Sequence, residues 1–373
     1  MVSGKWALVH QISELHKCSS PSAKVNNMTD FEKIYSFENL YRAHLRARCG
    51  KRYQAEVIAF ESCLSENLVC LSESIRDKTY RVSDYYSFKI YDPKERDIHA
   101  LHYRDRVVQH CICDEVLEPT LDKKLIYDNC ACRKGKGTHF SMNRLTGFMR
   151  DLYKHHGTHG YFLKIDIKKY FNNIDHDILK QILCRKIYDT DVLELLYHII
   201  DSYEFTPNKG LPLGNQTSQW FAILYLDKID RFIKEELHIR YYTRYMDDMV
   251  LLHHDKTYLR YCRDEIQWKL QNDRLLETND KTKIFPVQNG VNYLGFHFYM
   301  TNTGKVIRKV KQATKKKYKK KVKEMQYQYA AYMIGYDDVR AVLNSYHAHL
   351  AHGNCYYLNC HILDNVWFKR NET

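Results

Sequence analysis

Three aspartates that lie far apart in the sequence have the residue type and the surroundings of a metal-binding site. Asp166 sits between Ile165 and Ile167 near the end of an apolar run, where a buried, unpaired carboxylate would cost several kcal/mol. Asp247 and Asp248 are adjacent and lie between two other apolar runs. If these runs are neighbouring strands, the three carboxylates crowd together and raise one another's pKa values. A divalent cation relieves the repulsion, and hard oxygen ligands select Mg²⁺.

Such a site supports in-line phosphoryl transfer. Two Mg²⁺ ions about 3.5–4 Å apart can activate an attacking hydroxyl and stabilise the leaving phosphate oxygen. The protein then supplies mainly positioning and charge. Taken in isolation, Asp247-Asp248 is equally typical of a polar hairpin turn, because Asp tolerates the unusual backbone angles of turns. The elements around the three aspartates must decide between these interpretations.

Those elements predict a sheet layered with helices. The run Tyr161–Ile167 has the pattern of a buried strand, and the apolar residues on either side of Asp247-Asp248 predict a hairpin with the Asp pair as its turn. Further helices are predicted at 177–187, 191–203, 220–237 and 256–270, and a last strand at 291–298. This order is typical of an α+β fold and differs from a doubly wound parallel sheet.

The flanking segments are predicted to be helical and basic. Residues 1–27 are polar and patternless, which predicts a loose extension, and residues 30–77 have the apolar spacing of two or three amphipathic helices. Alternating residues at 86–91 and 98–103 predict a hairpin that places Lys94 and Arg96 at or near its tip, a suitable cradle for phosphates. The segment 305–323 has many lysines and no acid, which predicts a helix with one face on nucleic acid.

Composition narrows the class of protein and its partners. The formal charge is +13, from 58 Lys and Arg against 45 Asp and Glu, which favours a polyanionic partner. No apolar run has the length of a membrane span, and the N-terminus lacks the apolar core of a signal peptide, so a cytoplasmic protein without membrane contact is expected. The basic, glycine-spaced loop at 132–139 suits an anion but is not a P-loop, so ATPase chemistry is unsupported.

Five stretches in sequence resemble the conserved motifs of reverse transcriptases. Asp166 with Tyr170-Phe171, the Gly210–Gly214 loop, and Tyr245–Asp248 resemble motifs A, B and C. Lys281-Thr282 and Tyr293–Phe296 resemble motifs D and E, and the order and spacing also match. Further likeness at 93–96, 105–106 and 345–350 extends the resemblance over roughly residues 40–360. The resemblance implies a right-hand polymerase with an antiparallel palm sheet backed by helices: fingers and N-terminal helices at 28–160, palm at 161–300, and a basic thumb-like helical region at 301–373.

The resemblance also implies a role for each matched residue. Asp166, Asp247, Asp248 and the carbonyl of Ile167 are expected to hold two Mg²⁺ ions, with Lys281 as a general acid for pyrophosphate. Phe171 matches the aromatic gate that excludes a 2′-OH and so favours dNTPs. The remaining expected contacts fall into two groups. The nucleotide is expected to meet Lys94, Arg96, Phe171, Leu213 and Gly214. Template and primer are expected to meet Arg133, Lys136, Gln219, Tyr293, Leu294, Gly295, Lys315, Lys316 and Lys319.

Departures from the family pattern indicate a branch. Many reverse transcriptases have Gln at the position of Leu213, where it contacts the nucleotide, and Leu cannot form that hydrogen bond. The loop with its Ser218-Gln219 ending resembles that of diversity-generating retroelement enzymes, which are error-prone. An antiphage defence reverse transcriptase is the alternative role, and a catalytically silent RNA-binding scaffold is the contrasting one. The expected partners are template RNA, cDNA, dNTPs and a structured non-coding RNA. An accessory protein is a further candidate partner.

Overall fold

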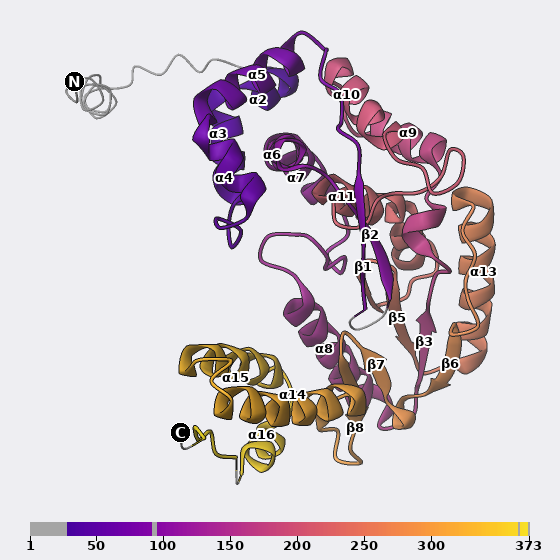
Figure 1. The fold of residues 1–373 in the computed structure, drawn as a ribbon. Coiled ribbons are helices and arrows are strands. Elements are labelled where there is room, and N and C mark those ends of the chain that lie inside the picture. Colours follow the sequence, from indigo (N-terminus) through magenta and orange to yellow (C-terminus); the bar gives the residue numbers. More distant parts are fainter. Residues whose placement is uncertain (1–27, 92–94, 365, 372–373) are drawn as a thin grey trace, which may run out of the picture.

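The computed structural model describes residues 28–91, 95–364 and 366–371. The expected N-terminal extension and Lys94 therefore lie outside the described residues. The chain forms a curved body with N-terminal helices at one end, C-terminal helices at the other and the sheets between them (Figure 1). The predicted α+β class, with an antiparallel sheet backed by helices, is confirmed.

The central sheet has four antiparallel strands in the order β4-β5-β3-β6. Its strands are β3 (Tyr161–Ile165), β4 (Tyr241–Tyr245), β5 (Asp248–His253) and β6 (Lys283–Pro286). Because successive side chains of a strand point to opposite faces, two cores form. Leu163, Ile165 and Leu251 pack with the helices on one face, whereas Phe162 and Leu252 pack with α8 (Thr138–His156) and the C-terminal strands on the other.

The N-terminal region has four helices where two or three were expected. They are α2 (Asp30–Tyr35), α3 (Phe37–Ala47), α4 (Ala55–Ser62) and α5 (Leu64–Arg76). The short α2 is a separate element because Thr29 and Glu32 form a capping box at its start and Ser36 has non-helical backbone angles at its end.

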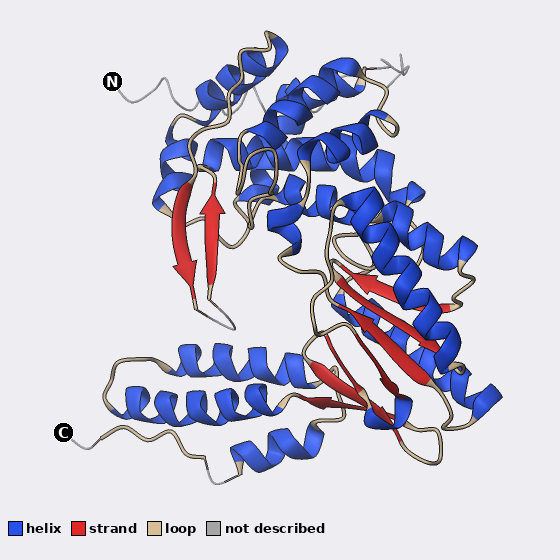
Figure 2. Cartoon of the chain, turned by 90° about the vertical axis from the view of Figure 1, so that its right-hand side faces the viewer, coloured by secondary structure: helices blue, strands red, loops and turns tan. Residues whose placement is uncertain are grey.

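The predicted basic hairpin is present, with strands β1 (Tyr86–Ile90) and β2 (Arg96–Ala100). Figure 2 shows it standing apart from the strands of the central sheet. Arg96 is the first residue of β2. The hairpin leads into a run of four consecutive helical elements, which are α6 (Tyr103–Ile112), η1 (Cys113–Leu117), α7 (Glu118–Leu121) and η2 (Asp122–Lys124). The long helix α8 (Thr138–His156) follows this run.

The helices behind the central sheet begin at side-chain caps. Asp175, Asp189 and Asp255 accept backbone N–H bonds at the starts of α9 (His176–Cys184), α10 (Thr190–Asp201) and α13 (Lys256–Arg274). The helix expected at 220–237 begins earlier and is divided, so that prediction was wrong in its bounds. It comprises α11 (Gln216–Tyr225), α12 (Asp227–Arg231) and η4 (Phe232–Glu236), with Leu226 outside helical geometry at the first break.

The C-terminal part differs from the sequence prediction in two places. The single strand expected at 291–298 is a hairpin of β7 (Val291–Tyr293) and β8 (Phe296–Met300), because Leu294 and Gly295 both have positive φ and reverse the chain. The helix expected at 305–323 begins as strand β9 (Val306–Val310), which pairs with β8 across the expected palm–thumb boundary at residue 300. The helices that follow are α14 (Gln312–Ala330), α15 (Tyr336–Leu350) and α16 (Tyr356–Leu363).

Within the described parts of the chain, no helix combines the length and the apolar character that crossing a membrane requires.

Candidate active site

The register of the central sheet brings the three aspartates to one end of it. Ile165 pairs with Met249, so continuing the antiparallel register by one residue places Asp166 opposite Asp248. Asp248 is the first residue of β5 and pairs with Tyr245. The turn is therefore Met246-Asp247, and the expectation that both aspartates form it was wrong. Met246, with φ of 55°, adopts the left-handed conformation that was assigned to Asp.

A buried arginine explains how a methionine is held in this conformation. Arg244 is fully buried, and its Nη1 donates a hydrogen bond of 2.9 Å to the carbonyl oxygen of Met246. The guanidinium also donates to both carboxylate oxygens of Asp230 in α12, at 2.7 and 2.6 Å, and to the carbonyl of Ile223 at 2.8 Å. The turn that carries Asp247 is therefore tied to the helix behind the sheet.

Asp248 has a cationic partner that sequence reasoning did not identify. Lys164 Nζ lies 3.0 Å from Oδ1 and 3.2 Å from Oδ2 of Asp248, and it also donates to the carbonyl of Asn292 in β7 at 2.7 Å. Burial raises the pKa of Asp248 to about 6, and Lys164 opposes that shift. Lys164 is two residues before Asp166 on β3, and this spacing on one strand face was the available signal.

Asp247 is subject to charges from three directions. Burial raises the pKa of Asp247, and the nearby carboxylate of Asp166 adds to the increase. Arg96 and Arg244 act in the opposite direction. Arg96, the first residue of β2, is thus within electrostatic reach of the turn.

Asp166 is held by the segment that precedes β6. The side-chain amide of Asn279 donates to Oδ2 of Asp166, and the N–H of Asp166 donates to the hydroxyl of Thr282 at 3.2 Å. Lys281 Nζ lies 3.7 Å from Oδ2, so the structure brings this expected residue to the site. Asn279 was missed, although it lies only two residues before Lys281. Ile167 is buried and pairs with Thr278, which anchors the backbone immediately after Asp166.

The donor set fits a hard divalent cation by its chemistry. Asp166, Asp247 and Asp248 offer carboxylate oxygens, which are hard ligands. Burial raises the pKa values of Asp247 and Asp248, so a cation beside them would favour their charged forms. Among the described residues, however, no group of three or more His, Cys, Asp or Glu side chains already converges on a common point. In the described arrangement, Asp248 is instead engaged by Lys164.

Phe171 and Gly214, two of the predicted nucleotide-contacting residues, each contact a neighbouring segment. Phe171 is half-buried beside Tyr170, and its carbonyl accepts a hydrogen bond of 2.8 Å from the N–H of Leu211. The motif A aromatic and the glycine-flanked loop are thus connected directly. Gly214 is exposed with φ of 113°, and a Cβ there would lie 3.6 Å from Ile98 of β2. The loop and the β1–β2 hairpin therefore approach each other.

The basic loop before α8 is arranged differently from the expectation. Arg133 points inward: its guanidinium bonds Asp122 and the carbonyls of Ile126 and Asn129. Lys136 donates to the carbonyl of Tyr127 and lies over the ring of that residue. These contacts stabilise the loop and engage four of the five N–H donors of Arg133 within the protein.

Gln219 lies in a cavity of about 370 Å³ beside Gly214, His110 and Trp220. Its side-chain oxygen accepts a hydrogen bond of 2.9 Å from the thiol of Cys132. The motif B helix is thereby connected to the basic loop. Neither the cysteine nor this contact was predicted, because the two residues are far apart in sequence.

The residues expected to meet template and primer divide into exposed and buried ones. Tyr293 is fully buried, and its hydroxyl lies 2.6 Å from that of Ser141, so its side chain belongs to the core. Leu294 and Gly295 form the β7–β8 turn, and a Cβ on Gly295 would lie 3.7 Å from His349 of α15. The three expected lysines are on α14, with Lys315 half-buried and Lys316 and Lys319 exposed.

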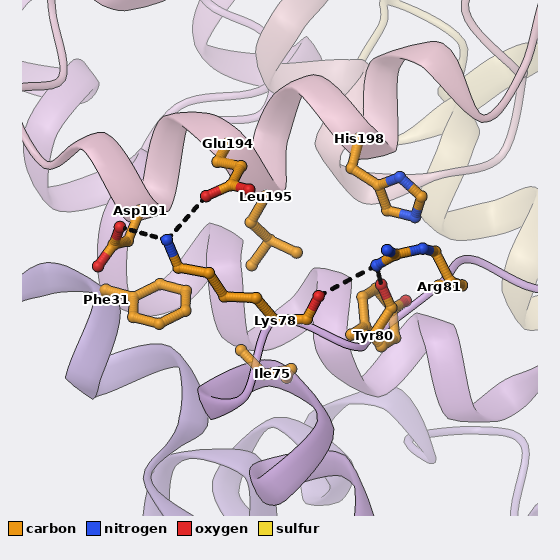
Figure 3. A pocket seen from close by; sticks show the side chains of 9 residues that line it. All are labelled: Phe31, Ile75, Lys78, Tyr80, Arg81, Asp191, Glu194, Leu195 and His198. Carbon is orange, nitrogen blue, oxygen red and sulfur yellow. Dashed lines mark hydrogen bonds and ion pairs between the residues drawn. The ribbon is translucent and has the colours of Figure 1, made fainter.

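A separate cavity of about 190 Å³ lies between α5 and α10 (Figure 3). Lys78 bridges Asp191 and Glu194 across it, at 2.8 Å to each. None of the predicted site residues lines this cavity, and its ion pairs connect the N-terminal helices to α10.

Residues 92–298, more than half of the chain, match the protein family described as "Reverse transcriptase (RNA-dependent DNA polymerase)". Among curated proteins, the chain is similar to the COX1/OXI3 intron 2 and intron 1 proteins of Saccharomyces cerevisiae, with 26% identity over 95 residues and 24% over 143. It is also similar to Protein YkfC of Escherichia coli K12, with 23% identity over 254 residues. These matches cover 24%, 36% and 56% of this chain but 11%, 16% and 65% of the relatives, so the chain spans only part of their length.

Solved structures with some likeness include apo telomerase from Candida tropicalis, with a TM-score of 0.46 and 15% identity over 61% of this chain and 49% of that one. Telomerase from Candida albicans, in complex with a fragment of telomeric RNA, has a TM-score of 0.49 and 11% identity over 78% and 60% of the two chains.

Proposed function

The chain belongs to the reverse transcriptase (RNA-dependent DNA polymerase) family, and on that premise we propose that it makes cDNA from an RNA template with dNTPs. One observation carries the proposal. The β3–β5 register places Asp166 opposite Asp248 and beside the Met246-Asp247 turn. Arg96 acts on the carboxylate of Asp247, and Lys281 lies near that of Asp166.

We propose the following division of labour within this site. Asp166, Asp247, Asp248 and the carbonyl of Ile167 would hold two Mg²⁺ ions. When bound, such ions activate the attacking hydroxyl and stabilise the leaving phosphate oxygen. Lys281 donates a proton to the departing pyrophosphate. Arg96, together with Lys94, binds the triphosphate through charge-assisted hydrogen bonds.

Sugar selection is assigned to Phe171. Its ring is half-buried against Tyr170, and its backbone is fixed by Leu211, so it cannot easily move away from a bulkier sugar. A rigid aromatic wall excludes an extra hydroxyl by steric contact, which favours dNTPs over NTPs.

We propose that the enzyme is error-prone and that it serves a diversity-generating retroelement. The support is Leu213, which offers no hydrogen bond where many relatives have Gln, and the Ser218-Gln219 ending of the same loop. A structured non-coding RNA and an accessory protein belong to this proposal. In an antiphage defence role, the same polymerase would copy a non-coding RNA of its own system. Sequencing the cDNA made in cells separates the two roles, since only the retroelement yields mutated copies of a variable gene.

The direct test is incorporation of dNTPs on a primed RNA template with Mg²⁺. A catalytically silent RNA-binding scaffold would bind the template without extending the primer. Extension that requires Mg²⁺ and an intact Asp247 supports the polymerase, and binding without extension supports the scaffold.

A further inference from the structure

A basic groove lies at the far end of β4 from the aspartates. It is a cavity of about 510 Å³ bounded by α8, by the end of β4 at Tyr241 and by Lys234 of η4. Tyr241 begins β4 and Tyr245 ends it before the turn, which corresponds to about 13 Å along the strand. The groove therefore belongs to a surface separate from the metal-binding turn.

The cations of this groove exceed the acids that could neutralise them. Five basic side chains line it: Arg144, Arg150, Lys154, Lys234 and Arg240. Only two acids, Asp128 and Asp151, accompany them.

Both acids are already engaged by part of the basic set. Asp128 is bound by Arg144 at 2.6 Å and by Lys234 at 3.1 Å. Asp151 accepts a hydrogen bond from Tyr241 at 2.7 Å and lies 3.2 Å from Arg240.

Arg150 and Lys154 have no acid within ion-pair distance in the part of the chain that the structure describes, and both are exposed. They lie one helical turn apart on α8, so their side chains project on the same side. Arg308 of β9 adds to the local positive charge. Burial and the nearby Arg150 lower the pKa of Arg308, whose donors reach only neutral groups on Asn143, Thr146 and His352.

Aromatic rings fix the cations on the floor of the groove. The guanidinium of Arg144 lies 4.6 Å from the ring centre of Phe148, and Lys234 Nζ lies 5.6 Å from the same ring. Phe148 and Tyr241 are themselves in contact, with ring centres 5.6 Å apart. Cations held over aromatic faces are partly dehydrated and pre-oriented, which favours binding of phosphate groups.

The groove is open above Gly147 of α8. Gly147 is exposed, lies between Arg144 and Arg150, and a Cβ added to it would meet no atom within 4 Å. A glycine in a helix interior costs stability relative to alanine, so the open space has a structural cost. It allows a polymer backbone to approach the helix closely.

We propose that this groove binds a single-stranded segment of RNA through its phosphates, away from the metal-binding turn. The choice of RNA over DNA rests on the proposed function, in which the RNA template is the long polyanion that is present before any cDNA has been made. Binding at this surface holds the RNA on the enzyme while the reaction at the metal-binding turn takes place on another part of the same RNA molecule.

The test is equilibrium binding of a labelled single-stranded RNA to the full chain, without dNTPs, over a series of salt concentrations. The double variant Arg150→Gln/Lys154→Gln is expected to bind roughly tenfold more weakly at low salt, and the slope of log affinity against log salt is expected to flatten by about 1.4. Extension of a short primer–template is expected to stay unchanged. An unchanged slope would overturn the proposal, whatever the outcome of the polymerase assay.

Two further variants distinguish RNA binding at the groove from a general effect of the protein's positive charge. Lys256→Gln/Arg260→Gln makes the same charge change on α13, and an equal loss of affinity there would show a diffuse effect and contradict the proposal. Gly147→Gln fills the groove without altering charge, and it is expected to weaken RNA binding while thermal stability rises, because Gln favours a helix interior more than Gly does. The same series with DNA of the same sequence tests the choice of polymer. A variant that loses affinity for DNA alone would overturn the assignment to RNA.

Discussion

Arg244 and Asp230 form a fully buried ion pair directly behind the Met246-Asp247 turn, with Nη2 2.6 Å from Oδ2. A second hydrogen bond, from Nε to Oδ1, makes the pair bidentate. A buried pair is weak support for stability in itself, but removal of one partner leaves an uncompensated charge. Because Arg244 also donates to Met246, the pair connects folding to the geometry of the turn.

The first prediction separates these two effects. Arg244→Met is expected to lower the free energy of unfolding by about 3–5 kcal/mol, because Asp230 is left buried without its counter-charge. Adding Asp230→Leu is expected to restore much of that stability. The double variant still lacks the donor to Met246, so its kcat is expected to stay low while its thermal stability recovers.

Urea unfolding and steady-state extension of a primed RNA measure the two properties separately. Full recovery of kcat in the double variant would show that Arg244 serves stability alone and has no part in positioning the turn.

The second prediction concerns the protein without metal. Burial raises the pKa of Asp248 to about 6, above its value in the unfolded chain. The contribution of this group to stability is therefore fully present below the unfolded pKa and is lost as pH rises through about 6. In EDTA at pH 8, Asp248→Asn is expected to increase the free energy of unfolding by about 1–3 kcal/mol.

Magnesium is expected to stabilise the wild-type protein at that pH and to have little effect on Asp248→Asn. Urea titrations of the wild type and of Asp248→Asn, each with EDTA or with Mg²⁺, measure the four free energies of unfolding. A loss of stability on Asp248→Asn in EDTA would contradict the view that the carboxylates repel one another when no metal is bound.

The third prediction tests the sugar gate. Phe171→Ala is expected to raise the efficiency of NTP use relative to dNTP use by at least about tenfold, because the wall against the 2′-hydroxyl is removed. Phe171→Tyr keeps the ring and serves as the control. The ratio of kcat/KM for matched nucleotides is the measurement. If the alanine variant keeps the wild-type ratio, Phe171 is an ordinary core residue.

The fourth prediction concerns accuracy. Leu213→Gln introduces a hydrogen-bonding side chain into the loop that approaches Ile98 of the fingers hairpin at Gly214. This variant is expected to make fewer errors, since a polar contact to the nucleotide adds discrimination. Leu213→Met, which keeps the volume and adds no hydrogen-bonding amide, is the control. Sequencing of cDNA copied from a defined RNA measures the effect, and an unchanged error spectrum would remove the support for low fidelity.

The sequence was sufficient to predict the sheet around Asp166 and the hairpin before and after Asp247, because alternating and apolar patterns are local signals. The family resemblance then joined segments that lie about eighty residues apart. The family resemblance could not predict the side-chain contacts that depend on how distant segments pack together. Lys164 with Asp248, Asn279 with Asp166 and Cys132 with Gln219 all belong to this class.

The incorrect predictions have physical causes of the same kind. Asp was expected to adopt the left-handed turn conformation on its local preference, but Arg244 imposes that conformation on Met246 from the core. Arg133 was expected to face a template because it lies in a basic loop. Its guanidinium instead bonds several carbonyls and Asp122 within the protein. The number of basic residues in a loop does not show which of them bond to the protein's own backbone.

The most direct test of the account is primer extension by Asp247→Asn on an RNA template with dNTPs and Mg²⁺. Asp264→Asn, an exposed change on α13, is the matched control for the loss of one carboxylate. The account predicts that Asp247→Asn folds and binds the template but extends the primer at least about a thousandfold more slowly, a loss on the scale of one strong transition-state interaction. Equal extension by Asp247→Asn and the wild type would contradict catalysis at this turn.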